Sequence, residues 1–179
     1  LNKYNVKVHH VSLGEVPDRA ILIFENLSEP LIKINKKMMY ESDNLSAEIF
    51  TKTLATKDTI PGNWDTGLKI IKSILADSAN LDTSKLNLAD GSGLSRYNLS
   101  SAKNFTQFLE YVYFSKYKDS FISSLPYGGS KSTLKERLIN FSYNIRAKTG
   151  SLSGVSCISG YIFSKKYGPL CFSILINGY

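Results

Sequence analysis

The spacing of apolar residues changes once along this chain, from a helical period to a strand period after residue 143. Before that point, apolar side chains recur every three or four residues, a spacing that predicts amphipathic helices. After it, short apolar segments alternate with turn residues, which predicts strands joined as an antiparallel meander. Helices that come first and strands that come last favour an α+β fold in which helices flank an antiparallel sheet.

The strand-forming part is expected to contain three strands, at residues 145–151, 155–164 and 170–176. Lys165 to Pro169 form a hairpin turn between the last two. If that turn is centred on Tyr167, paired residues have numbers that sum to roughly 332 to 336. Cys157 then faces a residue near 177 and Cys171 one near 163, which is too far apart for a disulfide.

The last expected strand, residues 170–176, is apolar at nearly every position. A strand of this kind is normally covered on both faces of its sheet. We expect the helices within residues 28–54 to cover one face. The other face and the free edge of this strand would need further chain, because an exposed apolar edge promotes aggregation.

The helical part is expected to contain four longer helices and one short helix. The first begins with Ser28 as its cap and Pro30 in its first turn, and it ends near Tyr40 and Glu41. The second should bury Leu45, Ile49, Phe50 and Leu54. Asp65 or Thr66 caps the third, Ser100 or Ser101 caps the fourth, and the short helix starts at Ser132. Short extended pieces are expected at residues 6–8 and 20–24.

Length and composition fit one globular domain with a substantial core. The chain has 179 residues, of which 42% are hydrophobic and 21% are charged. The net charge of +7 comes mostly from dispersed lysines, so we expect a solvated basic surface and no nucleic-acid partner. No apolar run reaches the roughly 20 residues of a membrane span. The two cysteines form no CxxC pair or Cys/His cluster, so neither a metal site nor a cofactor is expected.

The tripeptide Ser42-Asp43-Asn44 falls at the junction between the first two expected helices. A serine hydroxyl both donates and accepts a hydrogen bond, so Ser42 can relay a proton. The amide of Asn44 can hold a substrate amide through its carbonyl and its NH₂ group. Serine, aspartate and asparagine are also the residues that cap helices, and an isolated match would be read as a cap.

The tripeptide Lys148-Thr149-Gly150 lies in the first expected strand. A cation beside a hydroxyl suits a substrate carboxylate. The glycine lets a ligand approach the backbone closely, and the N–H of Ser151 can then help to bind an oxyanion. Alone, this tripeptide is a weak signal, because an exposed lysine at the start of an edge strand is common. Together with Ser42-Asp43-Asn44, it matches the second and third active-site motifs of the penicillin-recognising serine enzymes.

Longer segments carry a more specific resemblance. Residues 42–48, 90–96 and 147–152 closely resemble segments of the D-alanyl-D-alanine carboxypeptidases/endopeptidases of the penicillin-binding protein 4 type. Pro61-Gly62-x-Trp64 and the segment from Leu125 to Arg137 also match that family's pattern. The resemblance implies a β-lactamase/transpeptidase-like fold, here incomplete. It also implies that peptidoglycan stem peptides are the substrates, that β-lactams are inhibitors, and that the protein is periplasmic or otherwise extracytoplasmic.

The resemblance also implies roles for single residues. Ser42 would pass a proton to the leaving amine, Asn44 would hold the substrate backbone, and Lys148 would set the electrostatic field of the cleft. Thr149 would bind the terminal carboxylate, with Gly150 and Ser151 beside it. The loop from Asp90 to Gly93 is interpreted as structural, since its glycines permit tight turns and its aspartate can accept backbone N–H bonds.

The family's nucleophile, the serine of a Ser-x-x-Lys motif, is not found at a suitable place. Two such strings occur, beginning at Ser115 and Ser132, and both follow the Ser-Asp-Asn motif, whereas the family's nucleophile precedes it. Residues 1–179 are therefore expected to be the C-terminal part of a penicillin-binding domain, inactive alone, whose N-terminal part carries the nucleophile. A non-catalytic module that binds peptidoglycan peptides and a serine β-lactamase-like hydrolase or esterase are the alternatives.

Overall fold

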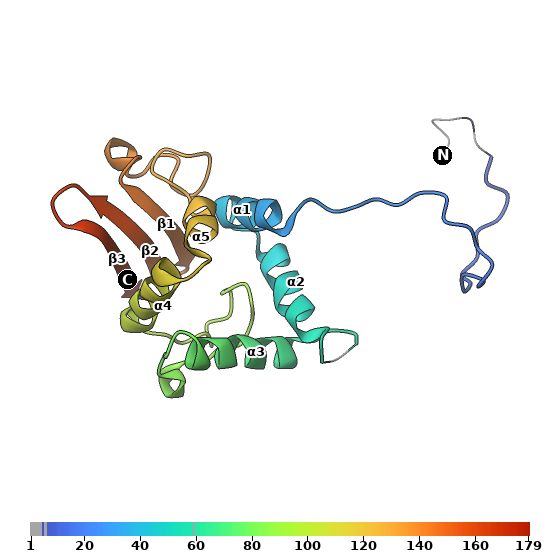
Figure 1. The fold of residues 1–179 in the computed structure, drawn as a ribbon, viewed down its shortest axis with the longest axis horizontal. Coiled ribbons are helices and arrows are strands. Elements are labelled where there is room, and N and C mark those ends of the chain that lie inside the picture. Colours follow the sequence, from blue (N-terminus) through green and yellow to red (C-terminus); the bar gives the residue numbers. More distant parts are fainter. Residues whose placement is uncertain (1–4, 6, 59) are drawn as a thin grey trace.

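The computed structural model describes residue 5, residues 7–58 and residues 60–179, and it has the expected α+β architecture. Helices occupy the first part of the described chain and an antiparallel sheet occupies the last part (Figure 1). The helices are α1 (Leu31–Glu41), α2 (Asn44–Ala55), α3 (Trp64–Asp77), η2 (Thr83–Lys85), α4 (Ala102–Phe114), α5 (Lys118–Ser124) and η3 (Ile139–Phe141). The strands are β1 (Ile145–Leu152), β2 (Val155–Ser164) and β3 (Gly168–Asn177).

The sheet has the expected strand order, β1-β2-β3, with both pairs antiparallel. In the β2–β3 pair, Cys157 lies opposite Leu175 and Cys171 opposite Tyr161. Each partner thus lies two residues from its expected position. The numbers of paired residues have the lowest sum in the expected range. Both thiols are free, which confirms that the cysteines are not linked to each other.

Two apolar clusters form on opposite faces of the sheet, because successive side chains of a strand point to opposite sides. On the helix side, Tyr161 packs with Leu109 and Leu125, and its hydroxyl donates a 2.7 Å hydrogen bond to the carbonyl of Leu109. On the other side, Leu134 packs with Ile145 and Ala147. The first cluster fixes α4 and α5 on the sheet, and the second fixes the segment before β1.

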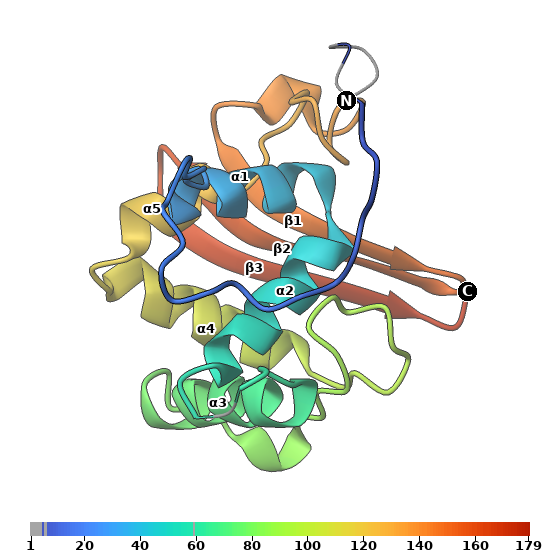
Figure 2. The same ribbon diagram turned by 90° about the vertical axis from the view of Figure 1, so that its right-hand side faces the viewer.

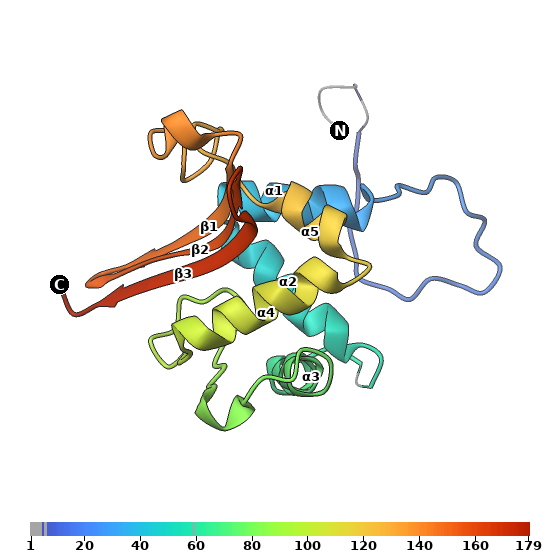
Figure 3. The same cartoon turned by 60° about the vertical axis from the view of Figure 1, so that its left-hand side comes forward.

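The helices α1 to α5 lie on one side of the sheet (Figures 1 and 3). The helix that packs along β2 and β3 is α4, whereas residues 28–54 were expected to cover this face. Met39 of α1 only reaches the edge of the Tyr161 cluster. The second helix, α2, packs instead on α3, and it buries Thr51 and Ala55 rather than the expected apolar residues. Leu45, Ile49 and Leu54 are exposed.

The close approach of α2 and α3 explains this difference. Gly67 on α3 is buried, and a side chain there would collide with the carbonyl of Thr51. Helices that approach this closely have small residues at the contact. The prediction assumed that large apolar residues mark the buried side, and for α2 it therefore named the exposed side.

Two further expectations about local structure are wrong. Pro30 precedes α1 and no side chain caps it, so Ser28 is not its cap. Residues 132–137 form turns instead of a helix, because the N–H of Gly129 bonds back to the carbonyls of Leu134 and Arg137 and closes a loop. The apolar run at 20–24 joins neither a helix nor a strand, and residues 7–30 lie away from the body of the molecule (Figure 1). Residue 6, at the start of the expected piece at 6–8, lies outside the described residues.

The outer strand β3 keeps an apolar face exposed. Leu170, Ile174 and Ile176 are 43%, 52% and 50% exposed. They belong to the same face as Phe172, opposite α4, and within the described chain β3 pairs only with β2. The expectation that further chain covers this face stays a prediction. Among the described helices, none has the length and apolar character to cross a bilayer.

Candidate active site

Ser42 and Asp43 form the junction between α1 and α2, where the sequence predicts it. Ser42 comes first. Its backbone lies in the left-handed region, at φ 55° and ψ 48°, and its N–H donates to the carbonyl of Met38. This conformation is unfavourable for a residue with a side chain, by about 1–3 kcal/mol, and such residues gather at functional sites. The turn directs the chain from α1 into α2 in front of β1 (Figure 2).

The helix cap at this junction is Asp43. Its carboxylate accepts hydrogen bonds from the N–H of Leu45, at 3.1 Å, and from the hydroxyl of Ser46, at 2.5 Å. The Ser46 bond is the main reason why the pKa of Asp43 lies below its ordinary value. Capping therefore uses the side chain of Asp43 and the backbone of Ser42, and it leaves the side chains of Ser42 and Asn44 available. Asn44 is the first residue of α2 and is exposed.

Lys148 and Ser42 are in direct contact, although the sequence separates them by 106 positions. The Nζ of Lys148 donates to the Ser42 hydroxyl at 2.8 Å and to the carbonyl of Thr149 at 2.7 Å. Lys148 is half-buried, and this burial lowers the pKa of its ammonium group. The ion pairs found in the described chain join Lys33 to Glu29 and Lys135 to Glu136, so the Lys148 charge is not neutralised by a described carboxylate.

The outer edge of β1 is paired with other chain before Lys148 and is unpaired, among the described residues, after it. Before it, the chain pairs with residues 126–127: the N–H of Ala147 donates to the Pro126 carbonyl at 2.9 Å, and Tyr127 pairs with Arg146. Backbone groups of a strand alternate in direction, so the N–H groups of Thr149 and Ser151 point outward like that of Ala147. The space beside Gly150 is also open. Apart from the adjacent residues, a Cβ atom added there would approach one described atom within 4 Å, the Cβ of Cys157 at 3.8 Å. Gly150 and Ser151 are both exposed, so this stretch of β1 is accessible.

Thr149 faces away from Lys148, because neighbouring residues of a strand point to opposite faces. It is buried, and its hydroxyl donates to the hydroxyl of Thr133. The structure therefore brings Ser42 and Lys148 together and places the Thr149 hydroxyl on the other side of the strand.

The loop from Asp90 to Gly93 has the structural role expected of it. Asp90 accepts 2.6 Å hydrogen bonds from the N–H groups of Gly93 and Ser95, and a 3.0 Å bond from the amide of Asn98. Partial burial raises the pKa of Asp90, but these bonds outweigh it and hold the pKa below its ordinary value. Gly93 has φ +84°, and a side chain at Gly91 would collide with the Thr51 hydroxyl.

Glu48 joins that loop to α2, a role that the sequence analysis did not assign. Its carboxylate accepts from the N–H groups of Gly91 and Ser92, at 3.2 and 2.9 Å, and from the Trp64 indole at 2.8 Å. At the end of the loop, Arg96 donates a 2.7 Å bond to the carbonyl of Ser153, which follows β1. Helix α2 and strand β1 are thus connected through the loop as well as through Lys148.

Neither Ser-x-x-Lys string is arranged for catalysis. The Ser115 hydroxyl donates to the carbonyl of Val112 at the end of α4, and Lys118 stacks on the ring of Tyr113 at 3.8 Å. The Ser132 hydroxyl accepts the N–H of Leu134, and Lys135 is exposed beside Glu136.

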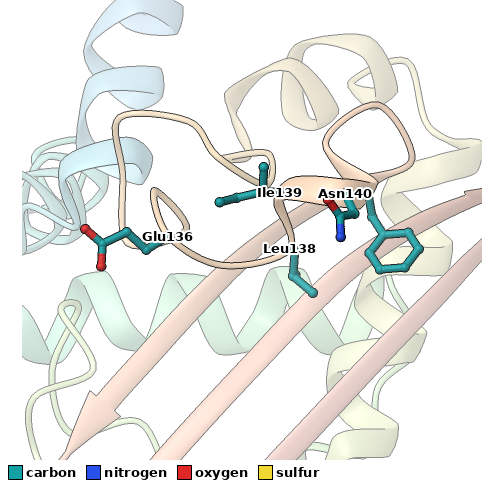
Figure 4. A pocket seen from close by; sticks show the side chains of 5 residues that line it. Glu136, Leu138, Ile139 and Asn140 are labelled. Atoms are coloured by element: carbon teal, nitrogen blue, oxygen red, sulfur yellow. The ribbon is translucent and has the colours of Figure 1, made fainter.

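A separate hollow lies in the segment before β1, lined by Glu136 and by residues 138–141 (Figure 4). None of the motif residues contributes to it, so we do not assign it to the site. The described residues contain no group of three His, Cys, Asp or Glu side chains that could hold a metal ion.

Comparisons with known proteins identify the family of this chain. Residues 4–179 match the model of the D-Ala-D-Ala carboxypeptidase 3 (S13) family. The chain is 34% identical over 174 residues to the D-alanyl-D-alanine carboxypeptidase DacB of Haemophilus influenzae, covering 94% of this chain and 36% of that protein. It is also 34% identical over 179 residues to the D-alanyl-D-alanine carboxypeptidase of an Actinomadura species, covering 94% of this chain and 33% of the relative. The chain thus spans about a third of the length of these relatives.

A solved structure shares the fold. Penicillin-binding protein 4 (dacB) of Haemophilus influenzae, crystallised with a novel β-lactam, superimposes with a TM-score of 0.80 at 34% identity. The match covers 93% of this chain and 40% of that one. The described structure is therefore a penicillin-binding protein 4 type of fold, and the chain belongs to the S13 family of D-Ala-D-Ala carboxypeptidases.

Proposed function

We propose that this chain supplies the second and third motifs of a serine D-Ala-D-Ala carboxypeptidase/endopeptidase that acts on peptidoglycan stem peptides. The observation that carries the proposal is the 2.8 Å hydrogen bond between Lys148 and Ser42. Two motifs remote in sequence meet at one point beside an open strand edge. A half-buried cation in contact with a hydroxyl is an arrangement suited to proton transfer near an anionic substrate.

In this proposal the attacking serine lies outside residues 1–179, in the N-terminal part of the same protein. Its hydroxyl oxygen forms an ester with the carbonyl carbon of the penultimate D-Ala. The bond from that carbon to the nitrogen of the terminal D-Ala breaks, and the nitrogen receives a proton through Ser42. Water then hydrolyses the ester. The coverage of about a third of each relative supports this division of the active site.

The remaining motif residues bind and orient the substrate. The exposed amide of Asn44 holds the peptide backbone, and the outward N–H of Ser151 binds the oxyanion that develops during acylation. Gly150 leaves the strand edge open to the peptide. Lys148 attracts the terminal carboxylate, and Thr149 helps to form the site that receives it.

The same groups would bind β-lactams, whose carboxylate and strained amide occupy the positions of the D-Ala-D-Ala end. The related Haemophilus protein has been crystallised with a β-lactam, which supports this assignment. Because its substrate is the cell wall, we place the protein outside the cytoplasm, in the periplasm or an equivalent compartment.

Release of D-Ala from a stem pentapeptide by the complete gene product tests the proposal. The wild-type protein should release D-Ala and lose this activity after treatment with benzylpenicillin. Ser42→Ala should slow the release, whereas Ser73→Ala, which removes an exposed hydroxyl bonded to Asp77 on α3, should not. A wild-type protein that binds the peptide without cleaving it would instead favour a binding module.

A further inference from the structure

The hydroxyl of Thr149 already uses its proton within the protein. A threonine hydroxyl carries one hydrogen, and that of Thr149 is donated to Oγ1 of Thr133. Thr149 can accept a further hydrogen bond, but in this arrangement it cannot donate one to a carboxylate. A carboxylate is an acceptor only, so it needs a donor from another residue.

The hydroxyl of Thr133 accepts this hydrogen bond, so the Thr149–Thr133 contact does not use the proton of Thr133. Thr133 is more exposed than Thr149, which is 7% exposed. Because Thr133 accepts from Thr149, its proton is directed away from Thr149. Donation from Thr149 also polarises the Thr133 hydroxyl and strengthens it as a donor.

The backbone around Thr133 is fixed on both sides. The Ser132 hydroxyl lies 2.8 Å from that of Ser130, whose Oγ donates to the carbonyl of Tyr127 at 2.5 Å. The N–H of Leu134 donates to the Ser132 hydroxyl at 3.0 Å, and the Leu134 side chain is fully buried against Ala147. Thr133 therefore holds its place before any ligand arrives, which is a requirement for a specific contact.

The position of this turn places Thr133 at the accessible part of the strand edge. Residues 126–127 occupy the edge of β1 at Arg146 and Ala147, and the chain then turns back so that Thr133 contacts Thr149. Lys148, on the other face of the same strand, provides the positive charge. A carboxylate at this edge would thus lie between a cation and a paired hydroxyl.

We propose that Thr133 is a carboxylate-binding residue of the site, which donates the hydrogen bond that Thr149 cannot donate. This inference rests on the proposed function, because it concerns the terminal carboxylate of the D-Ala-D-Ala end or of a β-lactam. It assigns Thr149 the role of orienting and polarising Thr133.

The test compares acylation of the complete gene product by benzylpenicillin and by its methyl ester, which lacks the carboxylate. Thr133→Val and Thr133→Ala should lower the second-order rate with benzylpenicillin by about 10-fold to 100-fold, the effect of one hydrogen bond to a charged group. The rate with the methyl ester should stay within about 2-fold, because that ester accepts this bond weakly. Thr133→Ser should keep the wild-type preference. Thr106→Val is the matched control, since the Thr106 hydroxyl donates to carbonyls of its own helix, those of Ala102 and Lys103.

Three outcomes decide the matter. A selective loss with the free acid, restored by Thr133→Ser, supports the inference. Equal losses with both compounds, or no loss, overturn it, because a residue that only stabilises the turn cannot distinguish the acid from the ester. A wild-type protein that neither compound acylates overturns the proposed function, and this inference with it.

Discussion

The Nζ of Lys148 donates a 2.8 Å hydrogen bond to the hydroxyl of Ser42 and joins the first strand to the junction of the first two helices. The lysine has a second bond, to the Thr149 carbonyl, and both of its partners are neutral. Its charge is thus available to an incoming anion, while its geometry is already set.

Lys148→Ala should reduce acylation of the complete gene product by penicillins at least about 100-fold, the scale on which one preorganised electrostatic contact acts. The measurement is the second-order rate of labelling by a fluorescent penicillin. Lys135→Ala is the control, because Lys135 is exposed and pairs with Glu136. Equal rates for the wild type and Lys148→Ala would remove Lys148 from the mechanism.

Lys148 should also set the alkaline limit of acylation. Burial lowers its pKa from the ordinary value of 10.5, so its positive charge is present at low pH and is lost as the pH rises through the lowered pKa. The decline in acylation should therefore begin below pH 10.5. Lys148→Arg, whose guanidinium stays charged, should extend the remaining activity to higher pH, although its rate is lower because the contact with Ser42 changes. The same alkaline limit in both proteins would argue against this assignment.

Asp90→Asn should destabilise the complete protein at pH 7 by about 1–2 kcal/mol, since an amide accepts the N–H bonds of Gly93 and Ser95 less strongly than a carboxylate. The folded-state pKa of Asp90 lies below the ordinary value of 3.8. Its contribution is therefore complete above pH 3.8 and disappears as the pH falls through the folded-state pKa. Urea unfolding at several pH values should show a difference that shrinks in acid. A constant difference would indicate that the Asp90 charge is irrelevant.

The two cysteines should stay reduced, with different reactivities. They do not face each other across the β2–β3 pair, and Cys171 is exposed whereas Cys157 is partly buried. Iodoacetamide without reductant should therefore modify Cys171 before Cys157. An intact mass lower by about two units, the loss of two hydrogens on disulfide formation, would refute the register.

The sequence predicts the sheet well, because strand boundaries depend on short-range signals. Lys165 to Tyr167 form the turn, and the three strands differ from the expected limits by at most two residues. The two motifs were likewise recognisable, and their contact in space follows from the fold.

What the sequence did not predict depends on contacts between distant segments. The small residue Gly67 determines which side of α2 is buried, and Gly129 turns residues 132–137 into a loop. Glu48 could have been noticed as an acidic residue one turn after Asn44, but its partners, Gly91, Ser92 and Trp64, become neighbours only in the folded chain. The contact of Thr149 with Thr133 has no signal in the spacing of residues.

The most direct test of the central claim is to map the penicilloyl group after the complete gene product has reacted with benzylpenicillin. Digestion and mass spectrometry should place one penicilloyl group on a serine of a Ser-x-x-Lys motif outside residues 1–179. The chain of residues 1–179 alone should remain unlabelled under the same conditions. A stoichiometric penicilloyl group on any serine within residues 1–179, including Ser115 or Ser132, would contradict the account.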